Sequence, residues 1–107
     1  MKLTIKEKEY ELKFTFNSFR FMEDFNFSEL EEVQHKPFKL IGVTSQLLLG
    51  ALNHNRDEYY SQDDVEELME NILEENSIAE LLNDLVELLQ ESSFFKSLQK
   101  QTKKKKK

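Results

Sequence analysis

Residues 38–54 read FKLIGVTSQLLLGALNH, and this segment decides the fold. Its apolar side chains occupy nearly all sides of a helix: Phe38, Leu40, Ile41, Val43, Leu47, Leu48, Leu49, Ala51 and Leu52. A helix that is apolar all round is usually buried in the middle of a domain. We therefore expect a central helix that begins after Pro37 and ends near Asn53-His54-Asn55. Gly42 and Gly50 lie about two turns apart on it, and we expect them to permit close packing.

Two amphipathic helices are predicted after the central one. Ser61 precedes Asp64 by three positions, and Ser77 precedes Glu80 in the same way, which is the capping-box pattern of a helix N-terminus. The residues that follow each serine place apolar side chains at helical spacing: Val65, Leu68, Met69, Ile72 and Leu73 in the first, and Ile78, Leu81, Leu82, Leu85, Leu88 and Leu89 in the second.

The N-terminal residues have the period-two pattern of a β-hairpin, with apolar side chains at Leu3, Ile5, Tyr10, Leu12, Phe14 and Phe16. The turn should lie within residues 6–9, although these lack the Asn-Gly pair of a tight hairpin. A two-stranded ribbon is marginal alone, so its apolar face must lie on helices. A first helix is predicted over residues 17–25, with Phe19, Met22 and Phe25 on one face, followed by a short helical turn over residues 28–34.

These patterns together predict an α+β fold, with an N-terminal hairpin packed on about four helices. We expect a single domain over residues 1–98, with the hairpin at about 2–16 and the helices at about 17–98, and a lysine-rich flexible tail over residues 99–107. The chain has no cysteine, which excludes disulfides and thiolate metal sites. No signal-peptide pattern follows Met1, and no apolar run approaches the roughly 18 residues of a membrane span, so we expect a soluble protein with no membrane partner.

The net charge of −6 is distributed unevenly. Residues 1–56 are neutral, residues 57–95 contain thirteen acidic side chains and no lysine or arginine, and residues 96–107 contain seven lysines and no acid. The run of lysines at residues 103–107 could touch phosphates, but the acidic body would repel a nucleic acid. We therefore expect a solvated tail and no nucleic-acid partner. An acidic mimic of DNA, which would inhibit a nucleic-acid-binding protein, is the alternative interpretation of residues 57–95.

The inventory of reactive groups argues against an enzyme. His35 and His54 are the two histidines, and neither belongs to a recognisable nucleophile or carboxylate motif. His54, with Asp57 and Glu58, fits a solvated helix end better than a metal site. Two glycines cannot form a glycine-rich phosphate loop. We expect no catalysis, no metal and no cofactor.

The last helix has more apolar surface than one packing seam requires. From Ile78 to Leu89 its large apolar positions span roughly 160° of the helix. A domain this small can hardly bury them all, and exposed apolar patches commonly mark binding surfaces. The predicted partner-binding residues are Leu82, Val86, Leu89, Phe94 and Phe95. The alternative is that these residues close the core or a homodimer seam.

Several segments resemble the tail assembly chaperones of long-tailed phages and prophages of Gram-positive bacteria. They are LTI at 3–5, YELKFTF at 10–16, FRFMEDF at 19–25, the apolar helix at 38–54 and YS at 60–61, which opens an acidic helix. The resemblance implies a small non-enzymatic α+β protein in the cytoplasm of the bacterial host, absent from the finished virion. It implies that the chain coats the helical, aggregation-prone tape measure protein and helps to recruit tail tube protein.

This resemblance suggests a second interpretation of the lysine tail, because members of such families are often made in two lengths by a programmed translational frameshift. We therefore hypothesise that residues 103–107 record a slippery site, with an extended product that shares residues 1 to about 102. The alternative is a fortuitous or engineered charged tail. The first interpretation requires an A-rich heptamer and an overlapping downstream reading frame in the nucleotide sequence.

Overall fold

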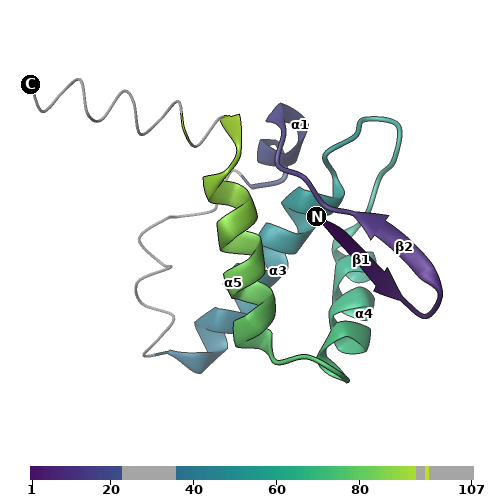
Figure 1. Cartoon of the computed structure of the whole chain (residues 1–107), viewed down its shortest axis with the longest axis vertical. Coiled ribbons are helices and arrows are strands. Elements are labelled where there is room, and N and C mark those ends of the chain that lie inside the picture. The colour runs from purple at the N-terminus through teal and green to yellow at the C-terminus, as the bar shows by residue number, and fades with distance from the viewer. Residues whose placement is uncertain (23–35, 94–95, 97–107) are drawn as a thin grey trace, which may run out of the picture.

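The central element is helix α3, Pro37–Leu52, which contacts α1, α4 and α5 (Figure 1). The computed structural model describes residues 1–22, 36–93 and 96. The predicted central helix is confirmed to within two residues at its C-terminal end, where Asn53 is the C-cap. From Val43 onward most of its side chains are buried, but nearer its start Phe38 is 89% exposed and Ile41 is 52% exposed. The expectation of burial all round therefore fails in the first turns of the helix.

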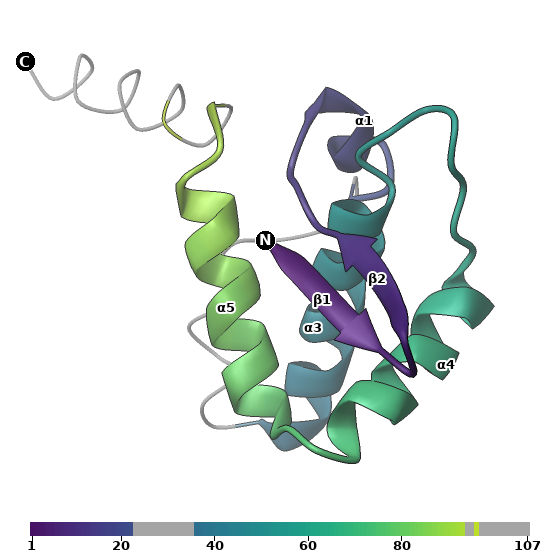
Figure 2. The same cartoon turned by 45° about the vertical axis from the view of Figure 1, so that its right-hand side comes forward.

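The predicted N-terminal hairpin is present and gives the chain its α+β fold. Strands β1, Lys2–Ile5, and β2, Lys8–Glu11, are antiparallel, with Leu3 opposite Tyr10 and Ile5 opposite Lys8. The turn between them lies in the predicted segment and consists of Lys6 and Glu7, with φ of 49° and 70°. Positive φ at both positions is the geometry of a type I′ turn, which here is built without the usual Asn-Gly pair. In Figure 2 the hairpin lies across α3, between α5 and α4, and its apolar side chains pack on the core.

The chain leaves the hairpin earlier than its period-two pattern predicts. The Lys13 N–H donates to the carbonyl of Ala51 at 3.2 Å, which carries the backbone away from the sheet and onto the end of α3. The short helix α1, Phe16–Phe19, follows, and Asn17 Nδ2 donates to the Asn53 carbonyl at 2.7 Å. The prediction that Phe16 continues the second strand is therefore wrong, and its side chain is 80% exposed.

The helix predicted over residues 17–25 begins near the expected position but ends early, since α1 ends at Phe19 and residues 20–22 are not helical. Phe19 is half-buried against the core, and Met22 is buried within it. Phe25 and the predicted helical turn over residues 28–34 lie outside the described residues.

Helices α4, Gln62–Leu73, and α5, Ile78–Gln90, begin where their serine caps predict. The Asp64 N–H donates to Ser61 Oγ at 3.2 Å, and the Ser61 N–H donates to Asp64 Oδ2 at 2.9 Å. Hydrogen bonding to the Asp64 carboxyl, first by the Ser61 N–H and then by the Ser61 hydroxyl, holds the pKa of this carboxyl below its ordinary value, because it favours the charged form. Ser77 Oγ accepts a bond from the Glu80 N–H at 3.1 Å. Both predicted N-termini are thereby confirmed.

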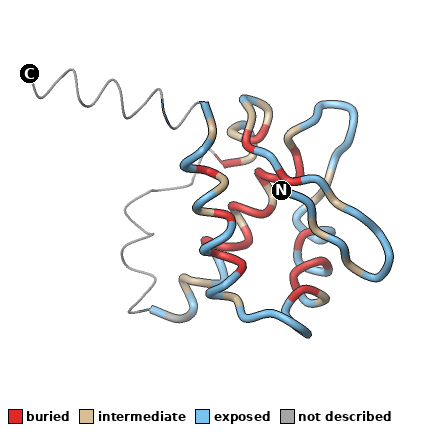
Figure 3. Tube along the Cα trace, viewed as in Figure 1, coloured by how far each residue is buried: buried red, intermediate tan, exposed pale blue. Residues whose placement is uncertain are grey.

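The buried residues of the three long helices form one core with Leu12, Phe14 and Met22, and Figure 3 shows the buried parts of the chain in red. Close packing at Gly50 is confirmed, because a Cβ atom there would overlap the side chain of Met22 and lie 3.3 Å from the Ser18 carbonyl oxygen. The same expectation fails at Gly42, where a Cβ atom would have no neighbour within 4 Å.

A buried asparagine fixes the loop between α3 and α4. Asn53 Nδ2 donates to the carbonyls of Leu49, at 2.9 Å, and Tyr60, at 3.0 Å, and Asn53 Oδ1 accepts from the Tyr60 N–H at 2.9 Å. Asn53 has no solvent exposure, so these bonds satisfy its amide completely within the protein. The consequence is that Tyr60 is held in one position beside β2.

Candidate partner-binding surface

The residues predicted from the last helix to bind a partner do not form an exposed surface among the described residues. Leu82 and Leu89 are buried, with exposures of 8% and 1%, and Val86 is half-buried. Phe94 and Phe95 lie outside the described residues. Helix α5 packs on α3, and its buried residues belong to the common core. Leu82 and Leu89 therefore stabilise the core of the chain.

The exposed apolar side chains are found instead on the outer face of α3. Phe38 and Ile41 are both exposed, and with Gly42 and Ser45 they occupy successive turns of one helical stripe. Residues of α4 lie opposite this stripe. Between the two stripes lies a depression of about 520 Å³, here named the α3–α4 groove, whose lining is Ile41, Gly42, Ser45, Gln46, Gln62, Glu66, Met69, Glu70 and Leu73.

A hydrogen bond connects the two helices at one end of the groove, and apolar side chains line the other end. Gln62 Nε2 donates to Ser45 Oγ at 2.9 Å, which bridges the start of α4 to the middle of α3. Met69 is buried and contributes apolar surface to the groove, whereas Ile41 and Leu73 are exposed. The groove therefore offers apolar contact to a molecule that lies along it.

Gly42 has no contact within the described chain that explains a glycine in the middle of a helix. Glycine costs about 1 kcal/mol relative to alanine at such a position. Because no atom lies within 4 Å of a Cβ built there, an alanine would fit without a clash.

The edge of the groove on α4 is acidic. Glu66 and Glu70 line it, are exposed, and lie one turn apart on the helix. The sequence from residue 57 to residue 95 contains no lysine or arginine that could neutralise them. A partner with an apolar stripe bordered by basic side chains is therefore complementary to this surface.

The sequence gave no signal that sets this groove apart from the core, because Gly50 also follows a large apolar residue in the same helix and is closely packed. Among residues 1–22, 36–93 and 96, no three His, Asp or Glu side chains gather where they could hold a metal ion. Over the same residues, no helix is both long enough and apolar enough to cross a membrane.

No known protein family, curated protein sequence or solved structure matches this chain.

Proposed function

We propose that this protein is a phage tail assembly chaperone that binds the tape measure protein and keeps it soluble during tail assembly. The α3–α4 groove is the observation that carries the proposal, since it presents exposed apolar side chains beside an acidic helix. A long helical client has the matching shape, because a helix can lay its apolar stripe into a groove between two helices. The sequence resemblance supports the same class of function.

In the proposed mechanism, apolar residues bind the client helix and acidic residues keep the complex soluble. Phe38, Ile41 and Leu73 cover an apolar stripe of the client helix. Each of these side chains, if it becomes fully buried, contributes up to about 3 kcal/mol to the binding free energy. Glu66 and Glu70 pair with basic residues beside that stripe. The thirteen acids between residues 57 and 95 give the coated client a negative surface, which keeps the complexes apart in solution.

The test is co-expression of the chain with a candidate tape measure protein, which is a long helical protein. Phe38→Ser removes an apolar side chain beside the groove and is expected to lower the amount of soluble complex recovered by size-exclusion chromatography. Ile41→Ser is expected to weaken binding of a purified client fragment about tenfold, which corresponds to about 1.4 kcal/mol. Neither change should alter the melting temperature by more than about 2 °C, because both side chains are exposed.

Phe16→Ser is the matched control, because Phe16 is comparably exposed but belongs to α1 rather than to the groove. It should leave client binding unchanged. Equal losses from Phe16→Ser and Phe38→Ser would refute the assignment of the groove as the binding surface. The absence of any complex with the wild-type chain would refute the proposed client.

The acidic half of the chain favours a second candidate, a DNA mimic or antirepressor that inhibits a nucleic-acid-binding protein. Its acids are exposed along α4 and α5, as such a mimic requires. A pull-down from host lysate separates the two functions. A DNA mimic captures a nucleic-acid-binding protein and releases it when duplex DNA is added, whereas a chaperone captures the helical client and is indifferent to DNA. A stable dimer in light scattering with no client bound would instead favour a homodimeric interaction module.

A further inference from the structure

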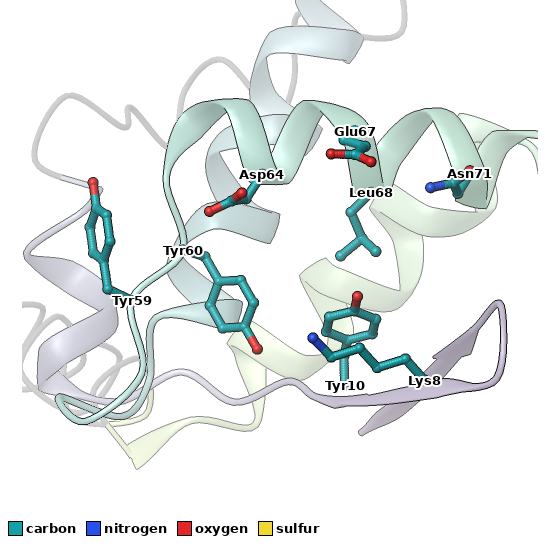
Figure 4. Close-up of a pocket in the computed structure, with 8 residues that line it drawn as sticks. All are labelled: Lys8, Tyr10, Tyr59, Tyr60, Asp64, Glu67, Leu68 and Asn71. Atoms are coloured by element: carbon teal, nitrogen blue, oxygen red, sulfur yellow. The ribbon is translucent and has the colours of Figure 1, made fainter.

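The three tyrosines of this chain all line one pocket, although they come from two distant parts of the sequence. Tyr10 is on β2, and Tyr59 and Tyr60 belong to the loop between α3 and α4. The pocket has a volume of about 320 Å³ and is completed by Lys8, Asp64, Glu67, Leu68 and Asn71 (Figure 4). It lies on the hairpin side of α4 and shares no lining residue with the α3–α4 groove.

Two aromatic rings form one wall of this tyrosine pocket. The rings of Tyr10 and Tyr60 meet edge to face, with centroids 6.2 Å apart and planes at 61°. The hydrogen bonds of Asn53 to the Tyr60 backbone fix the second ring from behind. Tyr59 is exposed, and Figure 4 shows its ring directed away from the other two, so it belongs to the rim.

The opposite wall is anionic and comes from α4. Asp64 and Glu67 are exposed, and neither forms an ion pair with any residue that the structure describes. The bonds from Ser61 keep the pKa of Asp64 low, so this carboxylate is charged at neutral pH. Leu68 is buried at the base of this wall and offers apolar contact to a methylene chain.

A cation already occupies the face of one ring. Lys8 Nζ lies 5.1 Å from the centroid of the Tyr10 ring, within the range of a cation–π interaction. Figure 4 shows the Lys8 amino group directed toward the tyrosine rings, across the pocket from α4. Lys8 reaches this place because it is two residues from Tyr10 on one strand, so both side chains lie on the same face. The pocket therefore accepts a positive group in the folded protein.

We propose that the tyrosine pocket is a binding site for an arginine side chain of a protein partner, which displaces Lys8 from the face of Tyr10. A guanidinium is planar, so it stacks on an aromatic ring and still donates several hydrogen bonds in its plane. Glu67, Asp64 and the tyrosine hydroxyls supply the acceptors for those bonds. This inference is independent of the proposed chaperone function, because it concerns a different surface.

The experiment titrates the full chain with N-acetyl-arginine amide at constant ionic strength and follows tyrosine fluorescence. The chain has no tryptophan, and Tyr10 and Tyr60 form the aromatic wall of the pocket, so a change in their emission reports on this site, whereas the exposed Tyr59 on the rim contributes a background signal. A saturable change with the arginine compound is expected, and the uncharged citrulline analogue should bind at least about fivefold more weakly. An equal response to both compounds would overturn the proposal.

Two substitutions test the roles of the charged residues. Glu67→Gln should weaken arginine binding about two- to fivefold, whereas Glu66→Gln, which changes the neighbouring residue on the groove side, should leave it unchanged. Lys8→Gln should strengthen binding about twofold or more, because it removes the competing cation. Weaker binding by Lys8→Gln, or no effect of Glu67→Gln, would contradict an arginine site.

Discussion

Gly42→Ala and Gly50→Ala are the same substitution on the same helix, and we expect them to change stability in opposite directions. Alanine has less conformational freedom than glycine in the unfolded chain, so it loses less entropy when the helix forms. This effect alone should stabilise the folded protein by about 0.5–1 kcal/mol. At Gly42 the added methyl group meets no atom within 4 Å, so this gain should be observed in full.

At Gly50 the same methyl group has no room. It would overlap the side chain of Met22, which is itself buried, and it would lie 3.3 Å from the backbone oxygen of Ser18. Such overpacking costs about 1–3 kcal/mol, which exceeds the helix-propensity gain. The expected net effect of Gly50→Ala is a loss of about 1 kcal/mol.

The assay is thermal and urea denaturation followed by far-UV circular dichroism. For a domain of this size, 1 kcal/mol corresponds to a shift of about 4–8 °C in melting temperature, so Gly42→Ala should melt well above Gly50→Ala. Combining Gly50→Ala with Met22→Ala should reduce the loss caused by the glycine substitution, because the two side chains compete for one space. A Gly50→Ala variant that is as stable as Gly42→Ala would refute the packing argument.

Two further substitutions test interactions around the loop between α3 and α4. Asn53→Ala should cost about 3 kcal/mol in urea denaturation, because it leaves the backbone N–H and carbonyl of Tyr60 without their partner, and a loss below about 1 kcal/mol would contradict this role. Asp64→Asn should destabilise the protein at neutral pH in thermal melts. Because the folded pKa of Asp64 is lowered, its stabilising contribution is full above the ordinary value of 3.8 and is lost as the pH falls through the folded pKa. The difference between this variant and the wild type should therefore shrink in acid, and a difference that is independent of pH would exclude the charged cap as its cause.

Local chemistry allowed the helices and the hairpin to be predicted from the sequence. Ser61 and Ser77 mark the starts of α4 and α5, because a serine hydroxyl satisfies backbone N–H groups that the helix itself cannot. The alternation of apolar residues predicted a hairpin with its turn within residues 6–9, because neighbouring side chains of a strand point to opposite faces. These signals act over a few residues, so a single sequence is enough to recognise them.

The amino-acid sequence thus determined the elements and the α+β class, but tertiary packing decided which apolar residues became surface. The periodic pattern predicted that Ile41 is buried in the central helix and that Leu89 is exposed, but Leu89 is 1% exposed on α5, which packs on α3, and Ile41 is 52% exposed beside the groove. Packing also brought Tyr10 to Tyr60 across fifty positions of sequence, which no local pattern predicts. The physical reason is that backbone preferences are set by near neighbours, whereas burial depends on which distant segment arrives at each face.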